Sequence, residues 1–150
     1  MRDLGIVELF SKWLCGNPEA ISFITTVHQI VELWDDLIDQ DKPVKPKAIN
    51  AAFYAALIEL PRNGFYRANF ALLNPVFEAA ILDWFTANAL EQRWQENDLH
   101  SAYMLRCGIH MLTVMSARLI GGMEWANKVN LELRSLGDTF DEYSKEFGEK

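Results

Sequence analysis

The apolar residues of this chain recur at the three- and four-residue spacing of an amphipathic helix almost throughout. No run shows the two-residue alternation of a half-buried strand, so the pattern leaves no place for a sheet. We therefore expect an all-α fold, a compact bundle of six to seven helices. The helices are expected at residues 2–14, 18–40, 47–60, 65–73, 75–96, 99–120 and 123–136.

Proline and glycine mark where these helices begin and end. Asn17-Pro18 and Asn74-Pro75 each place an N-cap residue before a proline, which favours a helix start at both positions. The segment 41–46 holds two prolines and is the clearest loop. Gly121-Gly122 should break or kink the helix that precedes it.

The segment 75–96 is apolar all round its expected helix, which is typical of the centre of a bundle. We expect the other helices to surround it, or a second chain to cover it. The chain has five tryptophans and nine phenylalanines, which favour such an interface, and a homo-oligomer is the expected state. The apolar residues on this helix are Val76, Phe77, Ile81, Leu82, Trp84, Phe85, Leu90 and Trp94.

Length, charge and cysteine content narrow the classes of protein. The 150 residues carry a net charge of −7, which argues against binding to nucleic acid or to a membrane surface. Two cysteines, Cys15 and Cys107, and no signal-peptide pattern lead us to expect a cytoplasmic protein. The sequence contains no glycine-rich nucleotide loop and no Cys-x-x-Cys motif. A single helical domain is expected over 1–137, followed by a polar acidic tail at 138–150 that forms a frayed short helix.

One face of the expected helix 18–40 carries an acidic stripe. His28, Glu32, Asp35 and Asp39 are spaced four, three and four residues apart, and Asp36 lies beside them. Like charges at this spacing repel each other, so a bound cation would stabilise the arrangement. Mg²⁺ is held by one or two carboxylates together with substrate phosphates, and Asp35 and Asp39 could supply the two.

The sequence Asp35-Asp36-Leu37-Ile38-Asp39 resembles the first aspartate-rich motif of class I isoprenoid synthases. Asn97-Asp98-Leu99-His100-Ser101 is similar to the start of the second metal motif of terpene cyclases, although Leu105 stands where that motif has glutamate. The resemblance implies an isoprenoid-synthase-like fold in which Asp35, Asp36 and Asp39 bind Mg²⁺ and a diphosphate. It also implies that Asn97 and Ser101 contribute to a second metal site. In overall pattern the chain looks like small helical proteins of bacteria and their phages.

Two structural interpretations of the same stripe remain open. It lies opposite the apolar face of its helix, as an ordinary solvated face would. It could also join an ion-pair network, because bases on the apolar helix 99–120 need anionic partners, which Asp35, Asp39 or Asp83 could supply. Glu91 needs a partner for the same reason. The candidates for this network, or for lining a site, are His28, Glu32, Asp83, Arg106 and His110.

The sequence therefore supports two hypotheses from different classes. The first is an isoprenoid-synthase-like domain that binds Mg²⁺ and a diphosphate through its aspartate-rich helix, as an enzyme or as a degenerate relative of one. The second is a non-enzymatic interaction or assembly module that forms a homo-oligomer or docks a protein partner. Leu105, in place of a glutamate ligand, favours the second.

Overall fold

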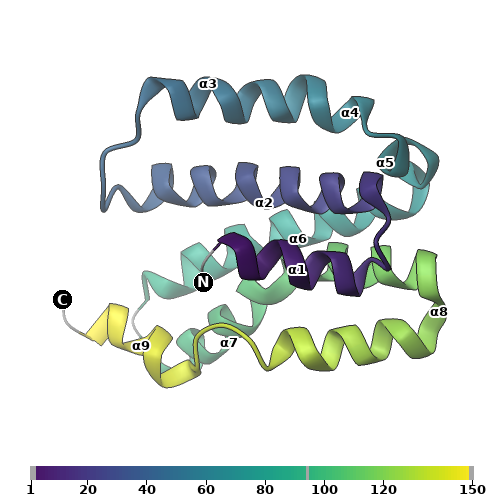
Figure 1. Cartoon of the computed structure of the whole chain (residues 1–150). Helices are drawn as coiled ribbons and strands as arrows, with labels where there is room; N and C mark the ends of the chain where they lie inside the picture. The colour runs from purple at the N-terminus through teal and green to yellow at the C-terminus, as the bar shows by residue number, and fades with distance from the viewer. Residues whose placement is uncertain (1–2, 94, 149–150) are drawn as a thin grey trace. The chain divides into compact units, whose positions relative to one another are not determined.

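A computed structural model describes residues 3–93 and 95–148 (Figure 1). Every regular element in these two ranges is a helix, which confirms the predicted all-α class. Two residues of the expected helices, Arg2 and Trp94, lie outside the described residues. In chain order the elements are α1 (Asp3–Trp13), α2 (Pro18–Asp39), α3 (Pro46–Tyr54), η1 (Ala55–Glu59), α4 (Leu60–Arg62), α5 (Gly64–Ala68), α6 (Phe70–Glu91), α7 (Glu96–Arg106), η2 (Cys107–Ile109), α8 (His110–Arg134) and α9 (Phe140–Gly148).

The chain divides into two compact units, Met1–Phe70 and Ala71–Lys150, which we describe one at a time. The first unit holds α1 to α5, and the second holds α6 to α9 apart from the first residue of α6. The single domain expected over 1–137 stays a prediction, because a compact unit can be part of a larger domain.

The N-terminal half of α2 lies in the core of the first unit. Its start is the predicted one: Oδ1 of Asn17 accepts a hydrogen bond from the Ala20 N–H at 3.0 Å, and Pro18 is the first helical residue. Phe23 is fully buried, and its ring centre lies 4.9 Å from that of Tyr66 on α5. The residues of α2 buried in this half are Ala20, Phe23, Ile24 and Val27. The N-terminal half of α2 is therefore buried.

A wide turn lies within the helix that spans residues 46–62. α3 passes into the π-helix η1 and then into α4, and the Leu60 N–H donates to the Ala55 carbonyl. Pro61 has no N–H, and in a regular helix its ring would clash with the carbonyl four residues earlier. The wider turn just before Pro61 accommodates that ring. The helix therefore continues through Pro61 and ends at Asn63, whose side chain caps α5.

In the second unit, the helix start predicted at Asn74-Pro75 is wrong. α6 runs from Phe70 to Glu91 without a break at Asn74-Pro75, so this dipeptide does not cap a helix. Pro75 lies in the second turn, where it removes one backbone hydrogen bond, and the turn before it buries Leu73 completely. Burying a leucine contributes about 2 kcal/mol, which outweighs the roughly 1 kcal/mol of one hydrogen bond.

α6 is less enclosed than its apolar sequence suggests. Leu82 is 57% and Phe85 is 50% exposed. Its packed face includes Ala80, which lies against Gly108 of η2. A Cβ added to Gly108 would lie 3.6 Å from the Cα of Ala80, so these two small residues let α6 and η2 approach closely. In the described part of the chain, α6 alone is long and apolar enough to cross a membrane, with 17% of its apolar window buried. Cover by a second chain, the alternative expected for this helix, stays a prediction.

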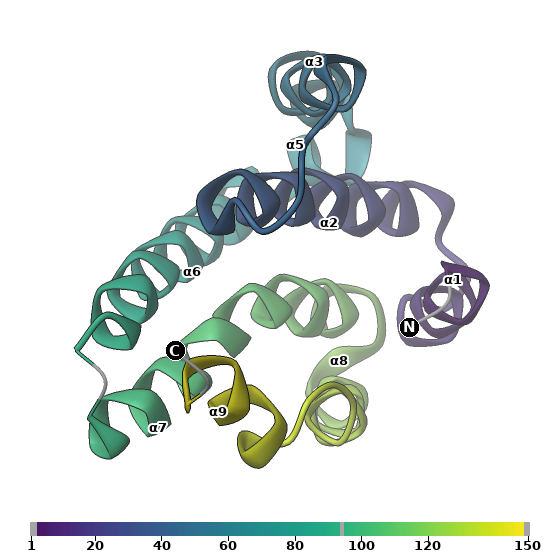
Figure 2. The ribbon, with the colours of Figure 1, turned by 90° about the vertical axis from the view of Figure 1, so that its left-hand side faces the viewer.

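The predicted break at Gly121-Gly122 is confirmed. Gly122 has φ 86° and ψ 179°, a conformation that is open to glycine and closed to residues with a Cβ. Figure 2 shows the two halves of α8 running in different directions on either side of this point. The helix expected over 99–120 differs, because η2 separates α7 from α8.

The C-terminal segment forms α9, which packs on α7, where the sequence led us to expect a frayed tail. Tyr143 is only 6% exposed, and its ring centre lies 5.3 Å from that of Tyr103. The Tyr103 hydroxyl donates to the Asp138 carbonyl at 2.7 Å. Phe140, Tyr143 and Phe147 recur at a spacing of three and four residues, so a narrow apolar stripe lies among the acidic residues of this helix.

Candidate functional site

The apolar face of α2 continues beyond its buried half and forms one wall of an open groove. Figures 1 and 2 both place α3 beside α2. The groove has a volume of about 430 Å³. Leu37 is 36% and Ile38 is 52% exposed, although both continue the face that buries Phe23. The lining residues are Ile30, Leu33, Trp34, Leu37, Ile38, Ala52, Phe53 and Ala56.

The groove is open because its α3 side is built from small side chains. Ala52 and Ala56, one turn apart, line it and are too short to fill the space. Three large apolar residues of this helix are largely exposed: Phe53 is 59%, Tyr54 54% and Leu57 68% exposed. Ile49 is half-buried and Leu60 is buried, so the helix turns other large apolar residues inward.

The π-helix η1 forms part of the same wall. Ala56 belongs to η1 and lines the groove, and Leu57 follows it on the exposed side. Turns of this type recur at functional sites in helical proteins, because they re-aim the side chains that follow them. Its position beside the groove favours a binding role for this surface.

The acidic stripe lies on the face of α2 that is turned away from the groove, as the residue spacing dictates. Glu32 and Asp39 are exposed, and Asp35 and Asp36 are half-buried. Oδ2 of Asp36 lies 3.3 Å from Nζ of Lys42, and Oδ1 of Asp35 is buried. Within the described residues no group of three or more His, Cys, Asp or Glu side chains could hold a metal ion. The magnesium site stays a prediction from the motif.

Thermal unfolding in the presence of Mg²⁺ and pyrophosphate tests whether the acidic stripe of α2 is a metal site or an ordinary solvated face. We expect no rise in Tm, because Lys42 neutralises Asp36 and one oxygen of Asp35 is inaccessible. A ligand that binds only the folded chain would raise Tm by mass action. A rise that disappears in Asp35→Asn would contradict this expectation and support a diphosphate–metal site.

His28 lines a separate pocket between α1 and α2. Its ring centre lies 5.1 Å from that of Phe10, and burial lowers the pKa of the imidazole below its ordinary value of 6.5. The pocket has a volume of about 270 Å³. It is lined by Ile6, Val7, Phe10, Thr25, His28, Gln29 and Glu32. These surroundings favour a neutral, structural histidine.

The lowered pKa of His28 makes the stability of the chain depend on pH. The unfolded imidazole binds a proton near its ordinary pKa of 6.5, whereas the folded one does so only at lower pH. The unfolded state therefore holds more protons in this range, and the free energy of unfolding falls as the pH drops below 6.5. Urea unfolding at about pH 7.5 and about pH 5.5 should show the fall, and His28→Gln should reduce it. An undiminished fall in the variant would assign it to other groups.

The second metal motif lies inside α7. Because α7 begins at Glu96 and not at residue 99 as expected, Asn97 and Ser101 lie one turn apart within the helix, and both are exposed. Leu105 packs against the core that Tyr143 closes, where the glutamate of the motif would be unfavourable. The helix therefore leaves two of the motif's ligand positions exposed, and the third, Leu105, is half-buried against the core.

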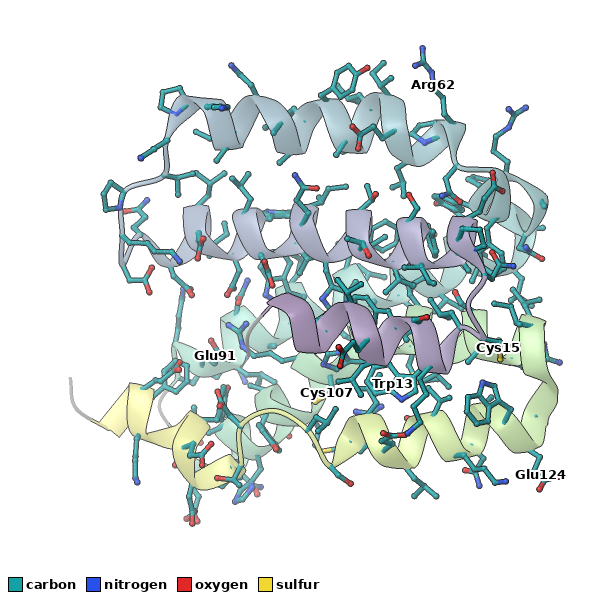
Figure 3. All side chains as sticks on the ribbon, viewed as in Figure 1. Trp13, Cys15, Arg62, Glu91, Cys107 and Glu124 are labelled. Carbon is teal, nitrogen blue, oxygen red and sulfur yellow. The ribbon has the colours of Figure 1, made fainter. Side chains whose placement is uncertain are left out.

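Glu91 and Arg106 form a buried ion pair in the second unit. Glu91, 8% exposed, accepts hydrogen bonds from Nε and Nη2 of Arg106, with Nη2 at 2.8 Å from Oε2. Nη2 also lies 2.9 Å from Oδ1 of Asn88, and the Tyr143 hydroxyl donates to Oε1 of Glu91 at 2.8 Å. Burial and the bond to Glu91 raise the pKa of Tyr143. The cluster joins α6, α7 and α9, and Glu91 is labelled in Figure 3.

This ion pair bears on one part of the ion-pair network considered from the sequence, the need of Glu91 for a partner. Glu91 has the partner that its burial requires, and that partner is Arg106. Pairing of the bases on this helix with Asp35, Asp39 or Asp83 stays a prediction. Asp83 is half-buried on α6, and a Cβ on Gly108 would lie 3.2 Å from its Oδ2. His110 is the half-buried first residue of α8.

The groove was not predicted from the sequence. One signal was present: the alanines at 52 and 56 alternate with Phe53, Tyr54 and Leu57, so the segment has a small-residue face and a bulky one. Only the structure shows that the small face is the one turned toward α2.

Comparison with known proteins identifies no relative of this chain. No protein-family model, curated protein or solved structure matches the chain. The resemblance to isoprenoid synthases therefore rests on its two short motifs.

Proposed function

We propose that this protein is a helical interaction module that binds an apolar helical segment of another protein in the groove between α2 and α3. The observation that carries the proposal is the half-covered apolar face of α2. Its first half is buried, and its second half lines an open groove of about 430 Å³. Enzyme chemistry is not needed to account for this surface.

A helix fits this groove better than an extended peptide or a small polar molecule. Two neighbouring helices form the walls, and a third helix packs its ridge of side chains into the groove between them. Partner helices in such grooves are held by apolar side chains at i, i+3, i+4 and i+7. The lining offers apolar and aromatic contacts, with Trp34 and Phe53 as its largest rings.

The surroundings of the groove also favour binding. Tyr54 and Leu57 extend the apolar surface outward from Phe53. Continuous apolar surface of this kind on a folded protein marks an interaction site more often than a solvated face. The groove is not filled by α9, the chain's own amphipathic acidic helix, because α9 already packs on α7.

Site-specific photo-cross-linking in the native host tests the proposal. A benzophenone amino acid in place of Phe53 should form a covalent adduct with one defined protein, and mass spectrometry should place the bond in an amphipathic helical segment. The purified segment should bind the full chain. Ile38→Asp should weaken that binding by roughly thirtyfold, about 2 kcal/mol, because it places a charge against apolar side chains.

A matched control uses an exposed apolar residue of the other unit. Leu131 on α8 is 65% exposed, close to the 59% of Phe53. The same cross-linker at Leu131 should not capture the partner, and Leu131→Asp should leave binding unchanged. Equal capture at both positions, or adducts only between copies of this chain at Phe53, would overturn the proposed function.

A further inference from the structure

We propose that two copies of this chain exchange their C-terminal helices, so that α9 of each copy docks on α7 of the other. The inference goes beyond the proposed function, because it concerns a different surface and does not involve the α2–α3 groove. It is carried by the contacts that hold α9 on α7, which an identical helix from a second copy would make equally well (Figures 1 and 2). It also gives the homo-oligomer expected from the sequence a specific interface.

Three aromatic rings hold α9 on α7. Phe140, Tyr143 and Phe147 form the stripe of α9, and the ring of Phe140 stacks on that of His100 with 3.7 Å between their centres. The ring centre of Tyr103 lies 5.3 Å from that of Tyr143. Large side chains at i, i+3 and i+7 are the anchors by which a protein surface recognises an amphipathic helix. The structure therefore shows which kind of helix this face of α7 accepts.

Two hydrogen bonds fix the register of the docked helix. The Tyr143 hydroxyl donates to Oε1 of Glu91 at 2.8 Å, and the Tyr103 hydroxyl donates to the Asp138 carbonyl at 2.7 Å. The face of α7 therefore takes a helix with a hydroxyl at its second anchor position and a backbone carbonyl just ahead of its first turn. The α9 of a second copy meets both requirements, because its sequence is the same.

The apolar face beneath α9 has to be covered. Ala87 on α6 and Ala102 on α7 are fully buried there, and Leu90, Leu99 and Leu105 are half-buried around them. Undocking α9 without a replacement would expose this surface to water, which is unfavourable. A chain that opens therefore recaptures a helix of the same kind, either its own or that of a neighbouring copy.

α9 carries its own start signal with it. The Thr139 N–H donates to Oε2 of Glu142, and the Glu142 N–H donates to Oγ1 of Thr139, both at 3.2 Å. This reciprocal capping is made within the segment, so it is the same whichever chain the helix docks on. The nine residues of α9 are too few for a stable helix in water, so the helix depends on the face of α7.

The linker between α8 and α9 is the part that changes when the helices are exchanged. Residues 135–139 are all exposed, and Gly137 adopts φ 90° in the closed turn, a conformation that strains residues with a Cβ. A short linker presents α9 to its own chain at an effective concentration in the millimolar range. The closed form therefore dominates at micromolar concentrations, and exchange becomes favourable near about 1 mM or when the closed turn is strained.

Sedimentation velocity of the full chain and of Gly137→Ala tests the inference. Nothing lies within 4 Å of a Cβ at Gly137, so alanine disfavours the closed turn through the backbone alone, whereas an exchanged linker is free to adopt a negative φ. We expect the natural chain to be monomeric at about 10 μM and to dimerise near about 1 mM. Gly137→Ala should dimerise at a concentration roughly a hundredfold lower, about tenfold for each of the two linkers.

Gly16→Ala is the matched control. Gly16 lies in a turn of the first unit with φ 70°, and nothing lies within 4 Å of a Cβ built there. This variant should remain monomeric at concentrations at which Gly137→Ala is a dimer. A Gly137→Ala chain that stays monomeric up to about 1 mM would overturn the inference, and so would equal dimerisation of both variants.

A mixture of two further variants tests whether the docked helix comes from another copy. Ala102→Trp overfills the face of α7 but keeps an intact α9, and Phe140→Ser/Tyr143→Ser/Phe147→Ser keeps the face but loses the stripe. Neither variant should associate with itself, whereas the mixture should form a one-to-one complex. If both variants keep the helix content of the natural chain by circular dichroism and the mixture stays monomeric, exchange is contradicted. A Gly137→Ala dimer that survives the three serine substitutions would contradict it as well, by assigning the dimer to another surface.

Discussion

Replacing Arg106 by methionine should lower the free energy of unfolding by about 3 kcal/mol. Glu91 is 8% exposed, and the change leaves its charge buried without the guanidinium that compensates it. Losing one partner of a buried pair typically destabilises a protein by about 3–5 kcal/mol. We expect the lower end, because the Arg106 side chain is 25% exposed and Tyr143 still donates to Glu91. Chemical denaturation at neutral pH, monitored by circular dichroism, measures the change.

The double variant Glu91→Leu/Arg106→Met separates the ion pair from packing. With both charges gone, the free energy of unfolding should return to within about 1 kcal/mol of the natural chain. Tyr143→Phe should cost only about 1 kcal/mol, since it removes a single hydrogen bond from a carboxylate that keeps its main partner. A double variant as unstable as Arg106→Met alone would show that the buried charge is not the cause.

Gly122→Ala should destabilise the chain by about 2 kcal/mol. Gly122 has φ 86° and ψ 179°, which a residue with a Cβ reaches only with strain of roughly 1–3 kcal/mol. Nothing lies within 4 Å of a Cβ built there, so the expected loss comes from the backbone and not from a steric clash. Thermal and urea unfolding of the variant measure it.

Gly5→Ala is the matched control for this substitution. Gly5 lies inside α1, its φ is in the ordinary helical range, and a Cβ there meets nothing within 4 Å. Alanine should therefore stabilise the chain by about 0.5–1 kcal/mol, through a better helix propensity. A Gly122→Ala variant that is as stable as the natural chain would show that α8 can remain helical through this point.

Helix starts and breaks were predicted correctly where a few adjacent residues determine them. Asn17-Pro18 starts α2 and Gly122 breaks α8, because a cap and a positive φ are properties of a few adjacent residues. Asn74-Pro75 carries the same capping signal but lies inside α6. There the burial of Leu73, a tertiary effect, outweighs the local preference.

Tertiary packing also determines two features that the sequence did not predict, the partner of Glu91 and the docking of α9. Glu91 was recognised as a carboxylate that needs a partner, but the choice of Arg106 depends on how α6 and α7 pack. The stripe Phe140, Tyr143 and Phe147 is short, and only its packing on α7 distinguishes it from a polar tail.

The groove could not be predicted from the sequence, for a different reason. Its α2 wall has the pattern of an ordinary buried face, and periodicity shows which residues are apolar without showing which are covered. Whether that face is filled depends on the side chains opposite, and these are the alanines at 52 and 56.

Hydrogen–deuterium exchange of the full chain, with and without the partner segment captured at Phe53, tests the central claim most directly. A helix seated in the groove should slow amide exchange in residues 30–38 and 49–57, and it should leave α8 unchanged. Protection confined to these two segments, and lost in Ile38→Asp, is the result expected of a docking groove. Protection in α8 instead, or none in either segment when the partner segment is bound, would contradict it.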